Sequence, residues 1–179
     1  MDKINTQENR PKLVRGYVNK ILFAAGVFAL INLILSCYLA YEYFFPDPKA
    51  YCEINAVWSC LTVAASSYAV FLGLPVSVWG IGFYGLLFLG TIGAVFNFPF
   101  WKIIKKLRPG VVLGILRYLS YFGILFSLYL TYAEIFEINA YCPFCVAQQI
   151  GIIIIAGLYI WANIVINKGK NETHVCEFC

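Results

Sequence analysis

The sequence predicts an all-α integral membrane protein: a four-transmembrane-helix bundle with a short outer interfacial helix or lid in the first outer loop. Hydrophobic residues make up 61% of the 179 residues, only 12% are charged, and the mean hydropathy is +0.77. These values lie outside the range of soluble globular proteins. In addition, four apolar stretches reach the roughly 20 residues that a helix needs to cross a hydrocarbon core of about 30 Å.

The four stretches set the expected organisation of the chain. We place the transmembrane spans at about 21–45, 75–98, 109–133 and 145–166. They form a membrane domain, residues 21–167, between a basic, flexible cytoplasmic tail, residues 1–20, and a short cytoplasmic tail, residues 168–179. The first stretch is too long for the h-region of a signal peptide and lacks a small-residue cleavage site. We therefore interpret it as an uncleaved signal anchor.

The distribution of lysine and arginine predicts the orientation. These residues gather before the first span, between the second and third spans, and after the fourth. The first and third connections carry only Lys49, beside several acidic residues. By the positive-inside rule, both termini and the middle loop face the cytoplasm. The net charge of +4 thus reflects topology, and we expect no nucleic-acid partner.

Four cysteines fall in or next to the two outer connections. Cys52 and Cys60 lie in the first connection, and a Cys-Pro-Phe-Cys motif, Cys142 to Cys145, opens the last span. The start of a helix stabilises the reactive thiolate form of Cys142. Pro143 suits the first helical position because no N–H is needed there. Cys145 then lies one turn deeper, close enough to Cys142 to form a disulfide.

Two pairs of cysteines on one side of a membrane predict electron transfer. The alternative is a non-enzymatic membrane protein, a transporter or scaffold, in which both pairs are structural disulfides. The outer loops offer little to brace, and the spans lack the paired intramembrane acids of a transport path. A dithiol oxidised at lipid depth needs a two-electron, lipid-soluble acceptor, and a quinone fits this description. We find no nucleotide, flavin or haem motif that indicates another cofactor.

Other features surround these cysteines. The apolar run Leu61–Leu72 is too short to span and is expected to lie in the outer interface as a lid. Gln148 and Gln149 follow Cys145 at membrane depth, where amides need partners from another helix or a ligand. The last residues contain a second Cys-x-x-Cys and the only histidine, His174. Three ligands at the end of a chain do not make a closed zinc site, so no metal site is predicted.

The order of these motifs resembles the vitamin K epoxide reductase family over about residues 20–167. The motifs are the Cys-x7-Cys of the first outer loop, Ser66 six residues after it, the Pro-x-Ser-x-x-Gly formed by Pro75, Ser77 and Gly80, and the Cys-Pro-Phe-Cys. Val76 and Gln149 stand where vertebrate members have an amide and a tyrosine. The resemblance is therefore to the stand-alone, prokaryotic type, and epoxide chemistry is not implied.

The resemblance implies a membrane dithiol:quinone oxidoreductase that generates disulfides in a thioredoxin-like partner. Cys142 and Cys145 would be the active pair, and Cys52 and Cys60 the shuttle pair. Cys52 would meet the partner, Cys60 would link transiently to Cys142, and Cys145 would face the quinone. The acceptor would be a ubiquinone, menaquinone or phylloquinone-type quinone.

The resemblance also suggests positions near the quinone. Ser66 matches the family's hydroxyl at the quinone site, and we add Trp79 and Gln149 as candidate quinone-binding residues. Many relatives carry a fused thioredoxin domain, which this sequence lacks, so we expect a separate periplasmic partner. We therefore place the protein in a bacterial inner membrane with its active site toward the periplasm. A DsbB-like quinone reductase is the alternative of similar chemistry, but there the Cys-x-x-Cys lies in the first outer loop.

Overall fold

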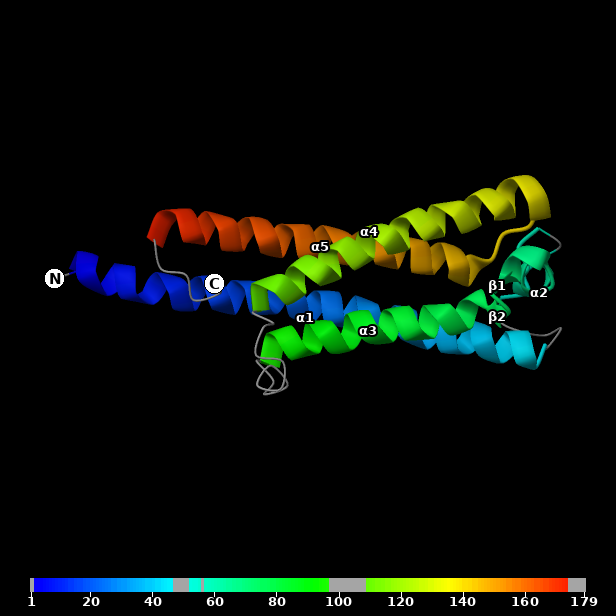
Figure 1. Ribbon diagram of the computed structural model, residues 1–179, viewed down its shortest axis with the longest axis horizontal. Helices are drawn as coiled ribbons and strands as arrows, with labels where there is room; N and C mark the ends of the chain where they lie inside the picture. Colours follow the sequence, from blue (N-terminus) through cyan, green and yellow to red (C-terminus); the bar gives the residue numbers. More distant parts are fainter. Residues whose placement is uncertain (1, 47–51, 56, 97–108, 174–179) are drawn as a thin grey trace.

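The computed structural model describes residues 2–46, 52–55, 57–96 and 109–173. Four long helices lie side by side and make one elongated bundle (Figure 1). They are α1 (Asp2–Phe44), α3 (Val76–Phe96), α4 (Pro109–Ala133) and α5 (Pro143–Thr173). The stretches long and apolar enough to cross a membrane are Val14–Phe44, Val76–Phe96, Gly110–Ile138 and Pro143–Lys168. The prediction of an all-α membrane protein with four spans is confirmed.

The two ends of the chain differ from the expectation. Residues 1–20 were expected to be a flexible tail, but the backbone is helical from Asp2 onward and runs into the first span. Extending an existing helix avoids the unfavourable nucleation step, and Lys, Arg, Gln and Glu are good helix formers. In the same way α5 continues to Thr173, so the first part of the expected tail 168–179 is helical.

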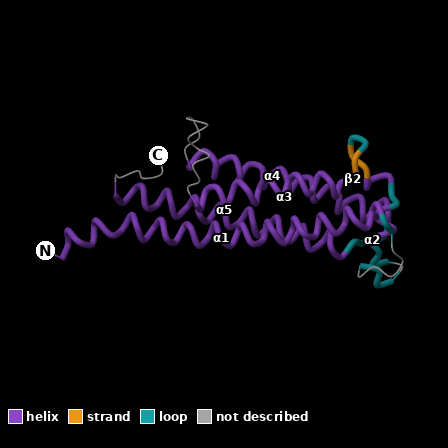
Figure 2. The backbone as a smooth tube through the Cα atoms, turned by 90° about the horizontal axis from the view of Figure 1, so that it is seen from below, coloured by secondary structure: helices purple, strands orange, loops and turns teal. Residues whose placement is uncertain are grey.

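The first outer connection folds into a cap at one end of the bundle (Figure 2). It contains α2 (Cys60–Ala64), the 3-10 turn η1 (Ser67–Ala69) and a hairpin of β1 (Val70–Phe71) and β2 (Leu74–Pro75). The strands are antiparallel, with Val70 opposite Pro75 and Phe71 opposite Leu74. Gly73 has a φ of 80° in the turn between them, a conformation that glycine adopts without steric cost. The expected short outer helix and lid are present in this cap.

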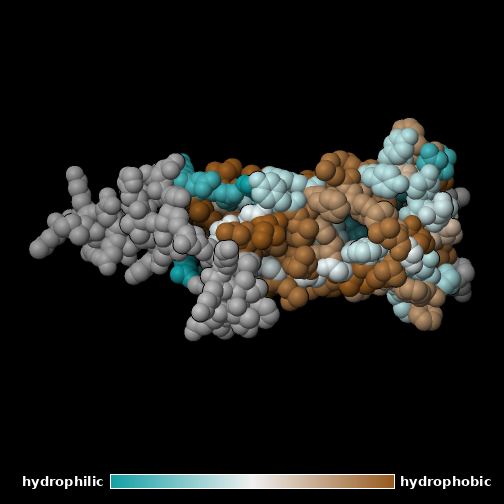
Figure 3. Space-filling view, viewed as in Figure 1, coloured by the Kyte–Doolittle hydropathy of each residue, from teal (hydrophilic) through white to brown (hydrophobic). Residues whose placement is uncertain are grey.

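All four helices contribute to one apolar core. Val18, Leu87, Leu116 and Ile155, one from each long helix, are buried there. A buried hydrogen bond of 2.5 Å joins the hydroxyls of Thr91 and Tyr159 and so ties α3 to α5. Large apolar side chains also cover much of the outer face of the bundle (Figure 3). Lipid tails are as apolar as these side chains, so an outward-facing apolar surface is what a membrane requires.

Helix α4 ends in a wider turn. Residues Glu134–Ile138 form the π-helical segment η3, and Asn139 ends it with a φ of 54°. Single π-helical turns of this kind occur often at functional sites. Glu134 and Glu137 would share one face of a regular helix, because residues three apart are neighbours there. Here Glu134 is buried while Glu137 is exposed.

Candidate active site

A short backbone bridge joins the two outer connections. The Tyr141 N–H donates to the Val57 carbonyl at 2.7 Å, and the Ser59 N–H donates to the Tyr141 carbonyl at 3.0 Å. The rings of Trp58 and Tyr141 stack over this bridge with centroids 5.4 Å apart. Cys60 and Cys142 each follow directly in the chain after a bridged residue. The bridge therefore places two cysteines, far apart in the sequence, next to one another.

The four outer cysteines converge in the structure. Cys52 and Cys60 form a disulfide, with Cα atoms 5.7 Å apart. The Cys60 Sγ lies 3.4 Å from the Cys142 Sγ. Cys142 and Cys145 are free thiols. Cys52, Cys60 and Cys142 are all buried and form a small cluster, against which Cys145 packs. The shuttle and active pairs suggested by the sequence are therefore adjacent.

The start of α5 determines how Cys142 and Cys145 lie. Helix α5 begins at Pro143, as predicted, so Cys142 is its capping residue. The Cys145 N–H donates to the Cys142 Sγ at 3.2 Å. This bond satisfies one of the backbone donors that have no partner in the first turn of a helix.

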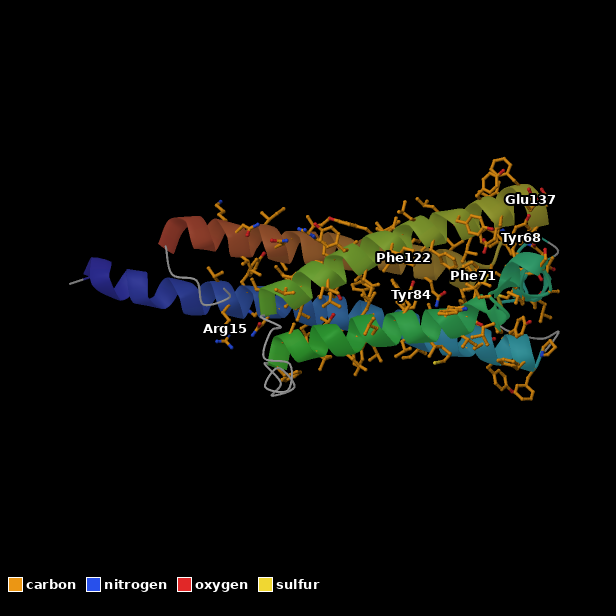
Figure 4. The ribbon with its side chains drawn as sticks, in the orientation of Figure 1. Arg15, Tyr68, Phe71, Tyr84, Phe122 and Glu137 are labelled. Atoms are coloured by element: carbon orange, nitrogen blue, oxygen red, sulfur yellow. A yellow bond between two sulfur atoms is a disulfide. The ribbon has the colours of Figure 1, made fainter. Side chains whose placement is uncertain are left out.

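A cavity of about 400 Å³ lies next to these cysteines, between the cap and the long helices. Such a volume is within the range of small-molecule sites. Aromatic rings supply much of the wall, among them those of Phe71, Tyr84 and Phe122, whose positions Figure 4 marks. Cys60, Cys142 and Cys145 all reach the lining. The cavity thus combines an apolar chamber with cysteine sulfur atoms at one side.

Two of the three candidate quinone-binding residues line this cavity. Ser66 and Trp79 are both part of the wall. The Ser66 hydroxyl donates to the Val63 carbonyl at 2.7 Å, and the Trp79 indole N–H donates to the Phe71 carbonyl at 3.1 Å. Both side chains are therefore held by the cap. Each also keeps some capacity for a ligand, the hydroxyl oxygen as an acceptor and the indole as a flat surface.

The third candidate, Gln149, is not among the lining residues. Its Oε1 accepts a hydrogen bond of 2.8 Å from the Thr131 hydroxyl and so joins α5 to α4. The neighbouring Gln148 lines the cavity instead. Its Nε2 donates to the Asn32 carbonyl at 3.0 Å and to the Ser36 hydroxyl at 2.6 Å. Consecutive residues of a helix point in different directions, so only one of the two amides can face the chamber.

Glu134 is a site residue that the sequence interpretation missed. Its side chain is only 4% exposed and lines the cavity. The carboxylate lies within hydrogen-bonding reach of the Cys142 N–H and the Cys145 thiol. The available signal was an acidic residue directly after an apolar span, eight positions before Cys142. The sequence interpretation used it only as evidence of orientation.

A second acidic residue holds the cap. The Tyr68 hydroxyl in η1 donates to the Glu137 carboxylate in η3, and Figure 4 shows the two side chains together at the outer end of the bundle. The negative charge of Glu137 raises the pKa of Tyr68 above its ordinary value. Tyr68 also lines the cavity. This contact fastens the lid to the end of α4.

Within the described ranges, one group of side chains has the spacing of metal ligands. The ligand atoms of Cys52, Glu53 and Cys60 lie within 4.8 Å of one another. However, Cys52 and Cys60 are joined in a disulfide, and metals bind the thiolate form of cysteine. The Glu53 carboxylate accepts the Leu61 N–H of the first turn of α2 at 2.8 Å. We therefore assign this group no metal role. His174, Cys176 and Cys179 lie outside the described residues.

The comparison with known proteins agrees with the arrangement of the cysteines. A family model described as the vitamin K epoxide reductase family matches residues 23–160, which is most of the chain. No curated protein matches the sequence. The family is a family of membrane oxidoreductases that act on disulfides, so its match replaces the DsbB-like alternative. The chain, an integral membrane protein with four spans, belongs to the vitamin K epoxide reductase family.

Proposed function

We propose that this protein is a membrane dithiol:quinone oxidoreductase that generates disulfides in a thioredoxin-like partner. The observation that carries the proposal is the 3.4 Å contact between the Cys60 Sγ and the Cys142 Sγ. It links the disulfide of the first outer loop to the Cys-x-x-Cys of α5, next to an apolar cavity. Structural disulfides would need neither the contact nor a cavity that reaches the sulfurs.

Electrons enter through the loop. A thiolate of the reduced partner attacks the Cys52 sulfur, and Cys60 leaves as a thiolate. The partner's second thiolate then attacks the mixed disulfide, so the partner departs oxidised and the loop holds a dithiol. Cys52 is only 1% exposed in this arrangement. Exchange with a protein partner therefore requires the first outer loop to open.

The electrons next cross to α5. The Cys60 thiolate attacks the Cys142 sulfur of the Cys142–Cys145 disulfide, and Cys145 leaves as a thiolate. Cys52 then attacks Cys60, which restores the loop disulfide and releases Cys142. A disulfide at Cys52 and Cys60 with free thiols at Cys142 and Cys145 is the distribution found in the structure.

The acceptor is a quinone in the cavity. Oxidation of the Cys142/Cys145 dithiol to a disulfide releases two electrons and two protons, which convert a quinone to a hydroquinone. The apolar wall suits the ring and isoprenoid tail of a ubiquinone, menaquinone or phylloquinone-type quinone. Ser66 and Trp79, which lie in that wall, are proposed to contact the ring. Gln148, which also lines the cavity, is a further candidate for contact with the ring. Gln149 is proposed to act indirectly, because its hydrogen bond to Thr131 joins α5 to α4 beside the cavity.

The distribution of positive charge supports the proposed orientation. The beginning of α1 and the end of α5 lie at the end of the bundle opposite the cap (Figure 1). Arg15 and Lys20 are on this half of α1, so the positive-inside rule puts both helix ends in the cytoplasm. The cysteines then face the periplasm of a bacterial inner membrane, where disulfides persist. A separate thioredoxin-like protein there would be the electron donor.

The test is quinone reduction followed by absorbance. Purified protein is mixed with a reduced thioredoxin-like protein and a soluble ubiquinone or menaquinone analogue. The parent and Cys37→Ala, which alters an exposed cysteine of α1, should turn over at similar rates. Cys142→Ala should lose turnover because it lacks the sulfur that accepts electrons from Cys60. A parent that reduces neither quinone would make the four cysteines structural.

A further inference from the structure

Glu134 is a buried carboxylate with no positive partner among the described residues. It is 4% exposed, and no lysine, arginine or histidine is among the groups that act on its charge. An unpaired buried charge is costly, so ionisable residues in membrane spans commonly mark a functional site. The groups within reach of Glu134 are instead the Cys142 N–H and the Cys145 thiol.

The local structure holds this carboxylate toward the sulfurs. Glu134 begins the π-helical segment η3, and Ala133 before it is also buried and lines the cavity. Three residues later, Glu137 is exposed and binds Tyr68 of the cap. The two acids of this turn therefore have separate surroundings: one fastens the lid, and the other lies in the chamber.

The reaction needs a group in this position. Two protons must pass from the thiols to the two quinone oxygens, and Glu134 supplies the one carboxyl group among the described residues that line the cavity. A carboxylate that reaches the Cys145 thiol and also borders the chamber can take up a proton at the sulfur and release it to a bound ring. Positioned acids and bases of this kind accelerate proton transfer by about 10² to 10⁴-fold.

We propose that Glu134 carries the Cys145 thiol proton to the quinone. The Glu134 carboxylate accepts the proton from Cys145, and the thiolate formed adds its electron pair to the ring. The Cys142 thiolate then attacks the Cys145 sulfur, the disulfide closes, and the electron pair of the broken sulfur–ring bond leaves with the ring. Glu134 returns its proton to one ring oxygen, and the proton of Cys142 reaches the other. Glu134 ends the cycle as it began, as a carboxylate.

This inference rests on the proposed function, so the experiment separates the two half-reactions. In the first, protein with an oxidised Cys142/Cys145 pair takes electrons from a reduced thioredoxin-like protein without quinone. In the second, pre-reduced protein meets a soluble ubiquinone or menaquinone analogue, and hydroquinone formation is followed in a single turnover. Glu134→Gln keeps the size and hydrogen bonding of the side chain but carries no exchangeable acid. Glu42→Gln is the control, because Glu42 is similarly buried and is not among the cavity-lining residues.

The expected result is a split between the half-reactions. Glu134→Gln should slow hydroquinone formation by about 10²-fold or more and leave the first half-reaction within about twofold of the parent. Glu42→Gln should leave both near the parental rates. Glu134→Asp keeps an acid one methylene shorter, so its second half-reaction should be faster than that of Glu134→Gln by roughly tenfold.

Three results would overturn the proposal. Parental hydroquinone formation in Glu134→Gln would show that no proton passes through this residue. An equal loss in both half-reactions would make Glu134 structural. Hydroquinone formation as slow in Glu134→Asp as in Glu134→Gln would show that the acidity of the side chain does not contribute. Glu134→Asp can be measured against the parent even if Glu134→Gln folds poorly. A parent without quinone reduction would instead count against the proposed function itself.

Discussion

Asn32 and Gly151 show how single residues set the distance between α1 and α5. The Asn32 side chain is buried, and its Nδ2 has no hydrogen-bond partner within the described part of the chain. A Cβ on Gly151 would overlap with this amide. The Asn32 carbonyl meanwhile accepts a hydrogen bond from Gln148, which borders the cavity. Close approach at Gly151 is thus one condition for the shape of the chamber.

Gly151→Ala should therefore destabilise the protein by about 1–3 kcal/mol, the usual cost of an added group in a packed core. Gly157→Ala is the matched control on the same helix, because a Cβ there meets nothing within 4 Å. It should cause no loss of stability, since alanine is a better helix former than glycine. Unfolding in denaturing detergent, followed by circular dichroism, measures both. Equal stability of the two variants would contradict the packing described here.

Two different contacts hold the cap against the rest of the bundle. At one end the bridge from Val57 and Ser59 to Tyr141 holds the cysteine loop. At the other, Tyr68 of η1 donates to Glu137 of η3. Glu137 raises the pKa of Tyr68, so the bond is present below the ordinary pKa of tyrosine. It is lost as the pH rises through the raised pKa, when the phenol ionises beside a carboxylate.

Removing that carboxylate should make Tyr68 titrate earlier. In an alkaline titration followed by phenolate absorbance, Glu137→Gln should ionise one tyrosine at lower pH than the parent does. The same change in a Tyr68→Phe background should leave the curve unaltered, because the responding phenol is gone. A shift that persists in that background would assign it to another tyrosine and remove the evidence for the clasp between cap and α4.

The elements also show what the sequence can and cannot predict. Hydropathy located the four spans because a membrane helix must be apolar along most of its length. Pro143 marked the start of α5 because proline is suited to that position. The chamber-facing side of α5 could not be predicted, because a helix that is apolar all round has no periodicity to fix its rotation. For this reason the sequence could not show that Gln148, rather than Gln149, lines the cavity. The π-helical turn that begins at Glu134 also departs from regular helix periodicity, so the direction of Glu134 could not be predicted either.

The whole molecule is a lipid-facing bundle with its chemistry at one end. Large apolar side chains cover much of its outer face (Figure 3). Cys60 begins α2 of the cap and Cys142 directly precedes α5, so this cysteine cluster lies at the end of the bundle opposite the beginning of α1 (Figure 1). Burial of Cys52, Cys60 and Cys142 protects the sulfurs from stray thiols. It also restricts exchange to neighbours in direct contact. This geometry supports the central proposal, in which electrons pass between the loop and α5 from Cys60 to Cys142.

Trapping that link is the most direct test. A Cys52→Ser/Cys145→Ser variant leaves Cys60 and Cys142 without their resolving partners, at a contact that is 3.4 Å between sulfurs in the parent. We expect these two to form a disulfide under mild oxidation, detected as a cross-linked peptide pair by mass spectrometry without reduction. The control Cys60→Ser/Cys145→Ser leaves Cys52 and Cys142 and should cross-link far less. Free thiols at Cys60 and Cys142, or equal cross-linking in the control, would contradict the relay.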